Sequence, residues 1–107
     1  GRNYYPQDLE ETASHSHPAL TSQGSAAFAI ERDGVEQLVI ACEVRRDKRR
    51  QLDPQRAIRA VRGALSAQHQ VRASQVMLLK PGSLPRTTSG KIQRSKARFI
   101  ATEKKVA

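Results

Sequence analysis

Residues 25–44 read SAAFAIERDGVEQLVIACEV, a pattern that predicts a β-hairpin. From Ser25 to Glu31, apolar side chains alternate with others, as in a strand with one buried face. Asp33-Gly34 indicates a tight turn, because glycine accepts a positive φ without a steric penalty. Leu38–Val44 is almost continuously apolar, so we expect the second strand to be the more buried of the two.

Helices and one further strand are expected around this hairpin. Pro6 suits the first turn of a helix that Pro18 ends, and Asp53-Pro54 supplies an N-cap and first residue for a second helix. Gln75–Leu79 has the composition of a short strand, and Arg94–Lys105 predicts a basic helix. That last helix is expected to pack through Ala97, Phe99 and Ile100. The order α-β-β-α-β-α predicts an α+β fold: a small three-stranded sheet packed with about three helices.

The length and composition limit the class of protein. A chain of 107 residues is enough for one domain with one modest core. No apolar run reaches the roughly 18 residues of a membrane span, and no signal peptide is visible. The single cysteine, Cys42, excludes an internal disulfide framework, so we expect a cytoplasmic protein in which Cys42 is a small buried side chain.

The charge is distributed unevenly along the chain. Residues 1–44 hold two basic and seven acidic side chains, a net of −5, whereas residues 45–107 hold 17 basic and three acidic ones, a net of +14. The second part therefore either faces an anionic partner or is a solvated basic surface. An exposed loop is expected to hold Arg45, Arg46, Lys48, Arg49 and Arg50.

Residues 84–92, LPRTTSGKI, are the segment whose residues point most clearly to a chemical role. A lysine after a glycine, in a loop rich in hydroxyl groups, suits a phosphate or a carboxylate. The phosphate-binding loop of nucleotide-binding proteins does not match, because Pro85 stands where that pattern needs glycine and Ile92 where it needs serine or threonine. Without further information, Lys91 could equally be one more exposed lysine in a polar hairpin.

Two motifs carry a family resemblance that spans essentially the whole chain. LPRTTSGKIQR, residues 84–94, resembles the C-terminal signature of the adenylate-forming enzymes, which include acyl-CoA synthetases, luciferases and the adenylation domains of peptide synthetases. GRNYYPQDLEE, residues 1–11, resembles the loop and helix that follow the hinge between the two domains of these enzymes, in the form typical of fatty acyl-AMP ligases. The resemblance implies that residues 1–107 are the mobile C-terminal domain of a larger enzyme, with the hinge residue just before Gly1.

The resemblance also implies roles for individual residues. Lys91 would be the catalytic lysine, which contacts the attacking carboxylate and the α-phosphate of ATP during adenylation. The substrate and nucleotide loop around it would consist of Thr87, Thr88, Ser89 and Gly90. The loop that faces the active site in the second half-reaction would consist of Gly1, Arg2 and Asn3.

The implied substrates and partners lie mostly outside this sequence. The enzyme would convert a fatty acid and ATP into acyl-AMP and pyrophosphate and pass the acyl group to the phosphopantetheine thiol of an acyl carrier protein. ATP and Mg²⁺ would bind mainly to the N-terminal domain, so the isolated chain is expected to be inactive, without a metal site of its own. The basic loop at residues 45–50 would contact the carrier protein, which is usually acidic.

Two alternative functions remain from the sequence. One is the C-terminal domain of an acyl-CoA synthetase that uses free CoA, and the other is a basic module that binds nucleic acid. The chain has only four aromatic residues, which do not alternate with basic ones, so stacking on nucleic-acid bases is disfavoured. His15 and His17 lack the spacing of a helical metal pair, and Glu43 is expected to be a surface charge at the end of its strand.

Overall fold

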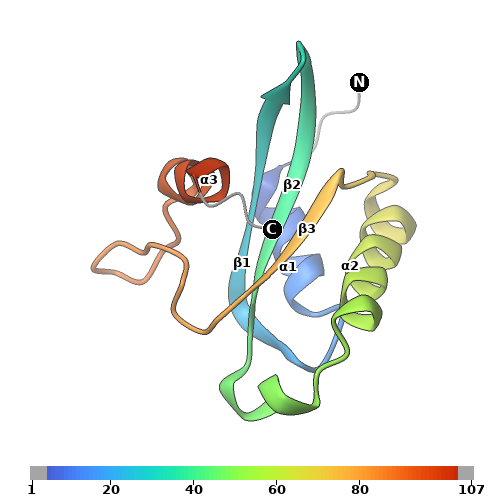
Figure 1. Cartoon of the computed structure of the whole chain (residues 1–107), viewed down its shortest axis with the longest axis vertical. Helices are drawn as coiled ribbons and strands as arrows, with labels where there is room; N and C mark the ends of the chain where they lie inside the picture. The colour runs from blue at the N-terminus through green and yellow to red at the C-terminus, as the bar shows by residue number, and fades with distance from the viewer. Residues whose placement is uncertain (1–4, 104–107) are drawn as a thin grey trace.

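The computed structural model describes residues 5–103, with the side chains of residues 5–99. The elements, in chain order, are α1 (Pro6–Ser14), β1 (Leu20–Arg32), β2 (Val35–Val44), the 3₁₀-helix η1 (Arg46–Gln51), α2 (Pro54–His69), β3 (Gln75–Leu79) and α3 (Arg94–Glu103). Figure 1 shows the sheet at the centre, with α2 along one side and α3 along the other. The α+β fold and the α-β-β-α-β-α order predicted from the sequence are therefore confirmed.

The three strands form one mixed sheet in the order β1-β2-β3. β1 and β2 pair antiparallel, and the turn between them has positive φ at both Asp33 (53°) and Gly34 (78°). Two positive φ values suit the right-handed twist of a hairpin. β3 pairs parallel to β2, and α2 makes the crossover between them. The expectation that the second strand is the more buried is also confirmed, because β2 is the central strand.

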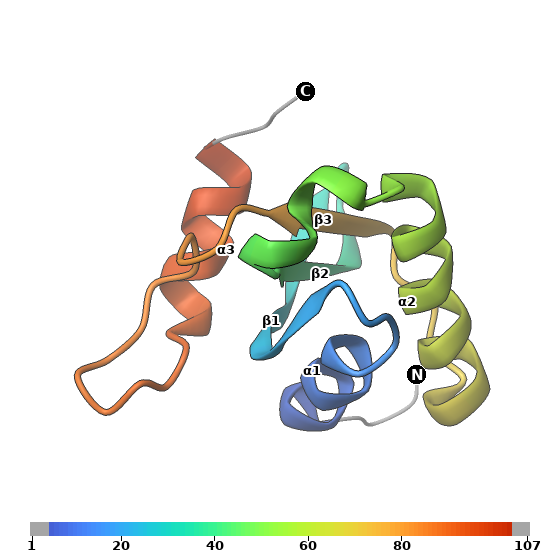
Figure 2. The same cartoon turned by 90° about the horizontal axis from the view of Figure 1, so that it is seen from below.

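The sheet is covered on both faces, so the domain has two apolar cores. One core places α1 and α2 against residues such as Ile40 and Leu38. The other places α3 and the segment after β3 against the opposite face, where Phe28 and Val39 lie. Figure 2, a view at right angles to the first, shows α1 and α2 grouped together and α3 on a separate side of the sheet. Burial on both faces explains why residues 38–44 are almost continuously apolar.

The predicted helix starts are accurate, and one helix end is not. The Asp53 carboxylate accepts hydrogen bonds from the backbone N–H groups of Gln55 (3.1 Å) and Arg56 (3.4 Å), as an N-cap does. α1 ends at Ser14 rather than beside Pro18. The Ser16 hydroxyl donates to the Ala13 carbonyl at 2.8 Å and so satisfies a carbonyl at the helix end in place of a further turn.

Two local expectations were wrong. Phe99 is 64% exposed and belongs to neither core, whereas Ala97 is buried as predicted, and the side chain of Ile100 lies outside the described ones. The segment expected to be an exposed loop has no buried residue, and residues 46–51 of it form the short helix η1. Glu43 is not a surface charge: its side chain is only 3% exposed, and it forms an ion pair with Arg86.

Within residues 5–103, no helix has both the length and the apolar character needed to cross a membrane.

Candidate active site

Lys91 lies on a narrow hairpin that we call the Lys91 hairpin, residues 85–93. Arg86 and Ile92 form an antiparallel bridge, and the Thr87 N–H donates to the Lys91 carbonyl at 2.8 Å. The Gln93 N–H donates to the Pro85 carbonyl at 2.9 Å and closes the base. Figures 1 and 2 both show this segment, in orange, projecting away from the sheet.

A tight turn at the tip of the hairpin sets the backbone next to Lys91. The Gly90 N–H donates to the Thr87 carbonyl at 2.9 Å, and Gly90 has a φ of +90°, a conformation that side chains with a Cβ rarely adopt. The Thr87 hydroxyl oxygen accepts the Lys91 N–H at 3.2 Å and lies 2.9 Å from the Ser89 hydroxyl. Thr87, Ser89 and Gly90 therefore shape the turn, while Thr88 is exposed beside them.

The Lys91 side chain is exposed to solvent. Among residues 5–99, whose side chains are described, its ammonium has neither a hydrogen-bond nor an ion-pair partner. The sequence expectation that Lys91 is available to an anionic ligand is compatible with this geometry.

The first strand of the Lys91 hairpin is tied to the sheet by a buried carboxylate. Both oxygens of Glu43, in β2, accept hydrogen bonds from the Arg86 guanidinium at 3.1 Å, and one also accepts the Leu84 N–H at 2.8 Å. Burial alone would raise the pKa of Glu43. The hydrogen bonds from Arg86 and Leu84 outweigh it and hold that pKa below its usual value. Glu43 is therefore an ionised side chain at neutral pH.

The chain that leaves the hairpin is tied by a second carboxylate. Glu10, in α1, accepts hydrogen bonds from the Arg94 guanidinium at 2.6 and 3.0 Å and from the Ala27 N–H at 2.9 Å. The hydrogen bond from Arg94 to Glu10 raises the pKa of the Arg94 guanidinium, which stays charged. Sequence reasoning missed both ion pairs. For Glu43, its place inside an almost continuously apolar strand was the available signal, since a buried carboxylate needs a cationic partner.

A groove of about 830 Å³ runs between α1, β1 and the Lys91 hairpin. Glu11 lines it from α1, His15 lines it from just beyond the end of α1, Gln23 lines it from β1, and Ser89 and Lys91 line it from the hairpin. Most of the lining residues are polar, and Lys91 and Arg94 give the groove positive charge beside the acidic groups of α1. The hairpin that bears Lys91 thus forms one wall of a surface groove.

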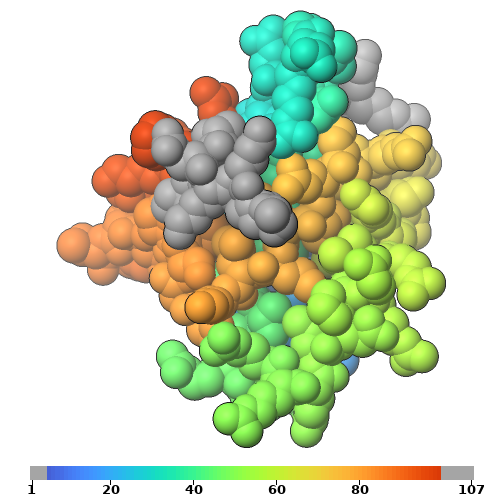
Figure 3. Space-filling view, viewed as in Figure 1, coloured from blue at the N-terminus to red at the C-terminus, as the bar shows by residue number. Residues whose placement is uncertain are grey.

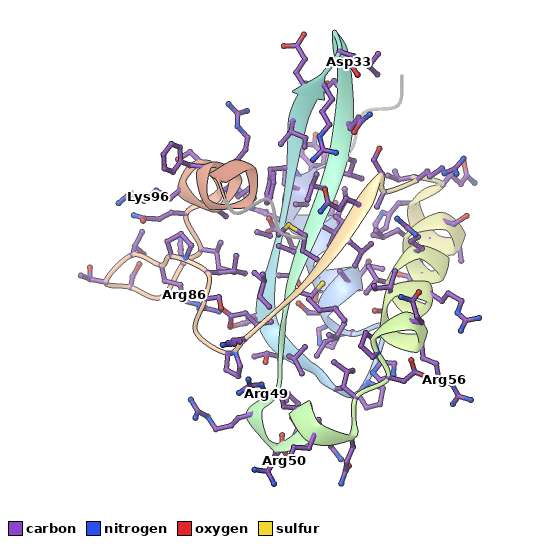
Figure 4. The ribbon with its side chains drawn as sticks, in the orientation of Figure 1. Asp33, Arg49, Arg50, Arg56, Arg86 and Lys96 are labelled. Carbon is purple, nitrogen blue, oxygen red and sulfur yellow. The ribbon has the colours of Figure 1, made fainter. Side chains whose placement is uncertain are left out.

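A second basic surface lies at the far end of β2, and we call it the basic ridge: Arg45, Arg46, Lys48, Arg49 and Arg50. Asp47 binds Arg45 at 2.7 Å, and Lys48 is half-buried, whereas Arg46, Arg49 and Arg50 are exposed. Figure 3 shows the green side chains of η1 and the start of α2 at the lower end of the molecule. In Figure 4, Arg49 and Arg50 lie at that end, below Arg86.

The remaining candidates have local explanations or lie outside the described residues. His15 and His17 each hydrogen-bond to nearby backbone, at 2.9 and 3.1 Å. Within the described part of the chain, no group of three or more His, Cys, Asp or Glu side chains could hold a metal ion. Cys42 is buried as predicted, and burial raises the pKa of its thiol to about 11, although a hydrogen bond with Ser25 acts in the opposite direction. The predicted active-site residues Gly1, Arg2 and Asn3 fall outside the described residues.

Comparison with solved structures supports this fold. The McyG A-PCP structure, in complex with phenylalanyl-adenylate, aligns with a TM-score of 0.84 over 97% of this chain and 19% of that one, at 23% identity. The fatty acid AMP ligase from Legionella pneumophila aligns with a TM-score of 0.75 over 96% of this chain and 18% of that one, at 28% identity.

The relatives found by sequence are, like the Legionella pneumophila structure, named as fatty-acid ligases. The medium-chain-fatty-acid–[acyl-carrier-protein] ligase JamA of Moorena producens is 45% identical over 92% of this chain and 17% of its own length. The long-chain-fatty-acid–AMP ligase FadD26 of Mycobacterium tuberculosis is 38% identical over 89% of this chain and 16% of its own length. The chain thus spans about a sixth of these relatives.

The family described as "Disco-interacting protein 2-like, AMP domain" matches residues 1–105. This match covers nearly the whole chain, and the resemblance seen in the sequence motifs agrees with it. The chain therefore belongs to the Disco-interacting protein 2-like AMP domain family.

Proposed function

We propose that this chain is the C-terminal domain of a longer ligase that activates a fatty acid for transfer to an acyl carrier protein. The fatty-acid carboxylate attacks the α-phosphorus of ATP, which gives acyl-AMP and releases pyrophosphate. The thiol of a carrier-bound phosphopantetheine then attacks the acyl carbon, which forms the thioester and releases AMP. The observation that carries the proposal is the Lys91 ammonium, which is exposed, has no partner among the described side chains, and lies on a projecting hairpin within the motif LPRTTSGKI.

Lys91 is proposed as the catalytic residue of the adenylation step. The attacking carboxylate and the α-phosphate are both anions, so their approach is opposed by charge repulsion. A lysine ammonium between them lowers this repulsion and stabilises the negative charge that develops in the transition state. Thr87, Thr88, Ser89 and Gly90 would form the loop that brings this ammonium to the nucleotide.

ATP and Mg²⁺ are assigned mainly to an N-terminal domain. Since the chain matches only 16–17% of the length of its relatives, the greater part of such an enzyme lies elsewhere. The isolated chain should accordingly fold without catalysing acyl-AMP formation.

The transfer step would use a different surface of this domain. After a rotation of the C-terminal domain, Gly1, Arg2 and Asn3 are proposed to face the active site while the carrier thiol attacks. The basic ridge is proposed to guide the carrier protein, because complementary charge raises the rate of association. The relative JamA is named as an acyl-carrier-protein ligase, which supports this acceptor over free CoA.

The test uses the full-length parent enzyme with ATP, Mg²⁺ and a series of fatty acids. We expect pyrophosphate release and acyl-AMP, followed by acylation of phosphopantetheine-loaded carrier protein and little reaction with free CoA. Efficient acyl-CoA formation would instead favour an acyl-CoA synthetase. Absence of any acyl-AMP, together with tight, salt-sensitive binding to DNA or RNA, would favour a nucleic-acid-binding module.

A further inference from the structure

The apolar core holds the Lys91 hairpin only in part. Leu84 and Ala97 are buried on either side of it and Ile92 packs against the same core, but every residue between Leu84 and Ala97 is exposed or only half-buried. A hairpin of two short strands is marginally stable when nothing else holds it. Contacts other than this limited core packing therefore help to fix its direction.

We propose that Glu43 is a positioning residue that holds the Lys91 hairpin in the orientation needed for adenylation. This inference rests on the proposed function, since it assumes that Lys91 acts on the reacting groups. Glu43 would not touch the substrate itself. It would act through Arg86 and the backbone of Leu84.

The contacts of Glu43 restrain both the position and the direction of the hairpin. Its carboxylate binds two nitrogens of the planar Arg86 guanidinium, an arrangement that limits rotation as well as distance. The Leu84 N–H adds a direct backbone restraint at 2.8 Å. Arg86 also donates to the Leu84 carbonyl at 3.3 Å, so side chain and backbone are tied together at this point.

The Glu43–Arg86 contact also restrains Lys91, through the strand that faces Arg86 in the hairpin. Arg86 is the bridge partner of Ile92, and Ile92 is the neighbour of Lys91 in the chain. Because Glu43 lies in the central strand of the sheet, it offers a rigid reference for this linkage. On the other side, Glu10 and Arg94 hold the chain that leaves the hairpin. The hairpin is therefore fixed at both ends by carboxylates from different elements.

The test is made on the full-length enzyme with Glu43→Gln, which keeps the size of the side chain and removes its charge. Arg86→Lys is the second variant, because it keeps the positive charge and loses the two-nitrogen contact. Glu36→Gln is the matched control: it removes an exposed carboxylate from the same strand. Each variant is assayed for acyl-AMP formation at saturating ATP and fatty acid, and separately for transfer of supplied acyl-AMP to carrier protein. Hydrogen exchange of the peptide covering residues 84–93 reports on the hairpin.

A misplaced catalytic group can lose about a hundredfold in rate. We therefore expect Glu43→Gln and Arg86→Lys to lower kcat for acyl-AMP formation by about 10- to 100-fold, with the KM for ATP changed by less than about threefold. Transfer from supplied acyl-AMP should be retained, hairpin hydrogen exchange should be faster, and Glu36→Gln should behave as wild type.

Three results would overturn the positioning role. The first is unchanged adenylation in Glu43→Gln. The second is an equal loss in both half-reactions, which would indicate general destabilisation. The third is full adenylation in Lys91→Ala, a variant that is run in parallel and also separates the two proposals. If it loses adenylation while Glu43→Gln does not, only the positioning role fails. If it retains full adenylation, the proposed function fails and the positioning role fails with it.

Discussion

Glu10 in the first helix binds Arg94 at the start of the last helix, at 2.6 and 3.0 Å, across 84 residues of chain. The same carboxylate accepts the Ala27 N–H of β1, so one side chain joins α1, β1 and α3. The pair lies beside the chain that leaves the Lys91 hairpin. It contributes both to the stability of the domain and to the geometry of the candidate site.

The first prediction concerns this pair. Glu10→Gln and Arg94→Gln, singly and together, should give a coupling free energy of about 1 kcal/mol, because partly exposed ion pairs are weakened by solvent. Urea unfolding of the 107-residue chain at low and high salt measures it. The coupling should shrink as the salt concentration rises. Strictly additive effects of the two changes would show that the pair does not stabilise the fold.

The second prediction concerns the pH dependence of stability. The pKa of Glu43 is lower in the folded state than its usual value, so the unfolded chain binds a proton at this site more readily. The stabilisation from Glu43 is therefore complete above the unfolded pKa and is lost as the pH falls through the folded pKa.

Urea unfolding of wild type and Glu43→Gln at a series of pH values tests this. Wild type should be more stable by about 2 kcal/mol at neutral pH, the contribution typical of hydrogen bonds to a charged group. The difference should shrink as the pH falls below about 4.5, the usual pKa of a glutamate, and through the lower pKa of Glu43 in the folded state. A difference that does not change with pH would contradict an ionised Glu43.

The third prediction concerns Gly90. A Cβ there would meet no atom within 4 Å, but the φ of +90° is unfavourable for alanine. Gly90→Ala should therefore cost about 1 kcal/mol through backbone strain or reshape the turn, and adenylation should fall by about tenfold. Gly63→Ala is the control: it is equally free of contacts, and in α2 it should slightly stabilise the protein. Equal behaviour of the two variants would argue against a conformational requirement at Gly90.

The fourth prediction concerns the basic ridge. Arg49→Glu should raise the KM for carrier protein by about tenfold and weaken its salt dependence, because charge steering acts mainly on association. Acyl-AMP formation, which needs no carrier, provides the internal reference. Arg72→Glu makes the same charge change between α2 and β3, at the other end of α2, and should have a much smaller effect. If both variants act alike, net charge rather than the ridge is responsible.

Local signals predicted most of the fold. The limits of β3 were predicted correctly, because Gln75–Leu79 is a short apolar segment between polar ones. The turn at Asp33-Gly34 and the cap at Asp53 were also recognisable, since each depends on the chemistry of a few adjacent residues. The parallel direction of β3 depends on a crossover connection, which a local pattern does not encode.

The candidate site was predicted less completely. The motif around Lys91 was visible as a contiguous segment, but its supports come from distant parts of the chain. Glu43 and Arg86 are 43 residues apart, and Glu10 and Arg94 are 84 residues apart. No periodicity or spacing rule links such residues. A charged residue inside an apolar strand predicts that a counter-charge exists but does not identify it.

The most direct test of the central claim is acyl-AMP formation by the full-length enzyme carrying Lys91→Ala, compared with wild type. Loss of one electrostatic donor to a developing charge typically costs 10²–10³-fold in rate, so we expect adenylation to fall by roughly that factor. The fold should remain intact, because the Lys91 side chain is exposed. Acyl-AMP formation at the wild-type rate would contradict the account and would leave Lys91 as an ordinary surface lysine.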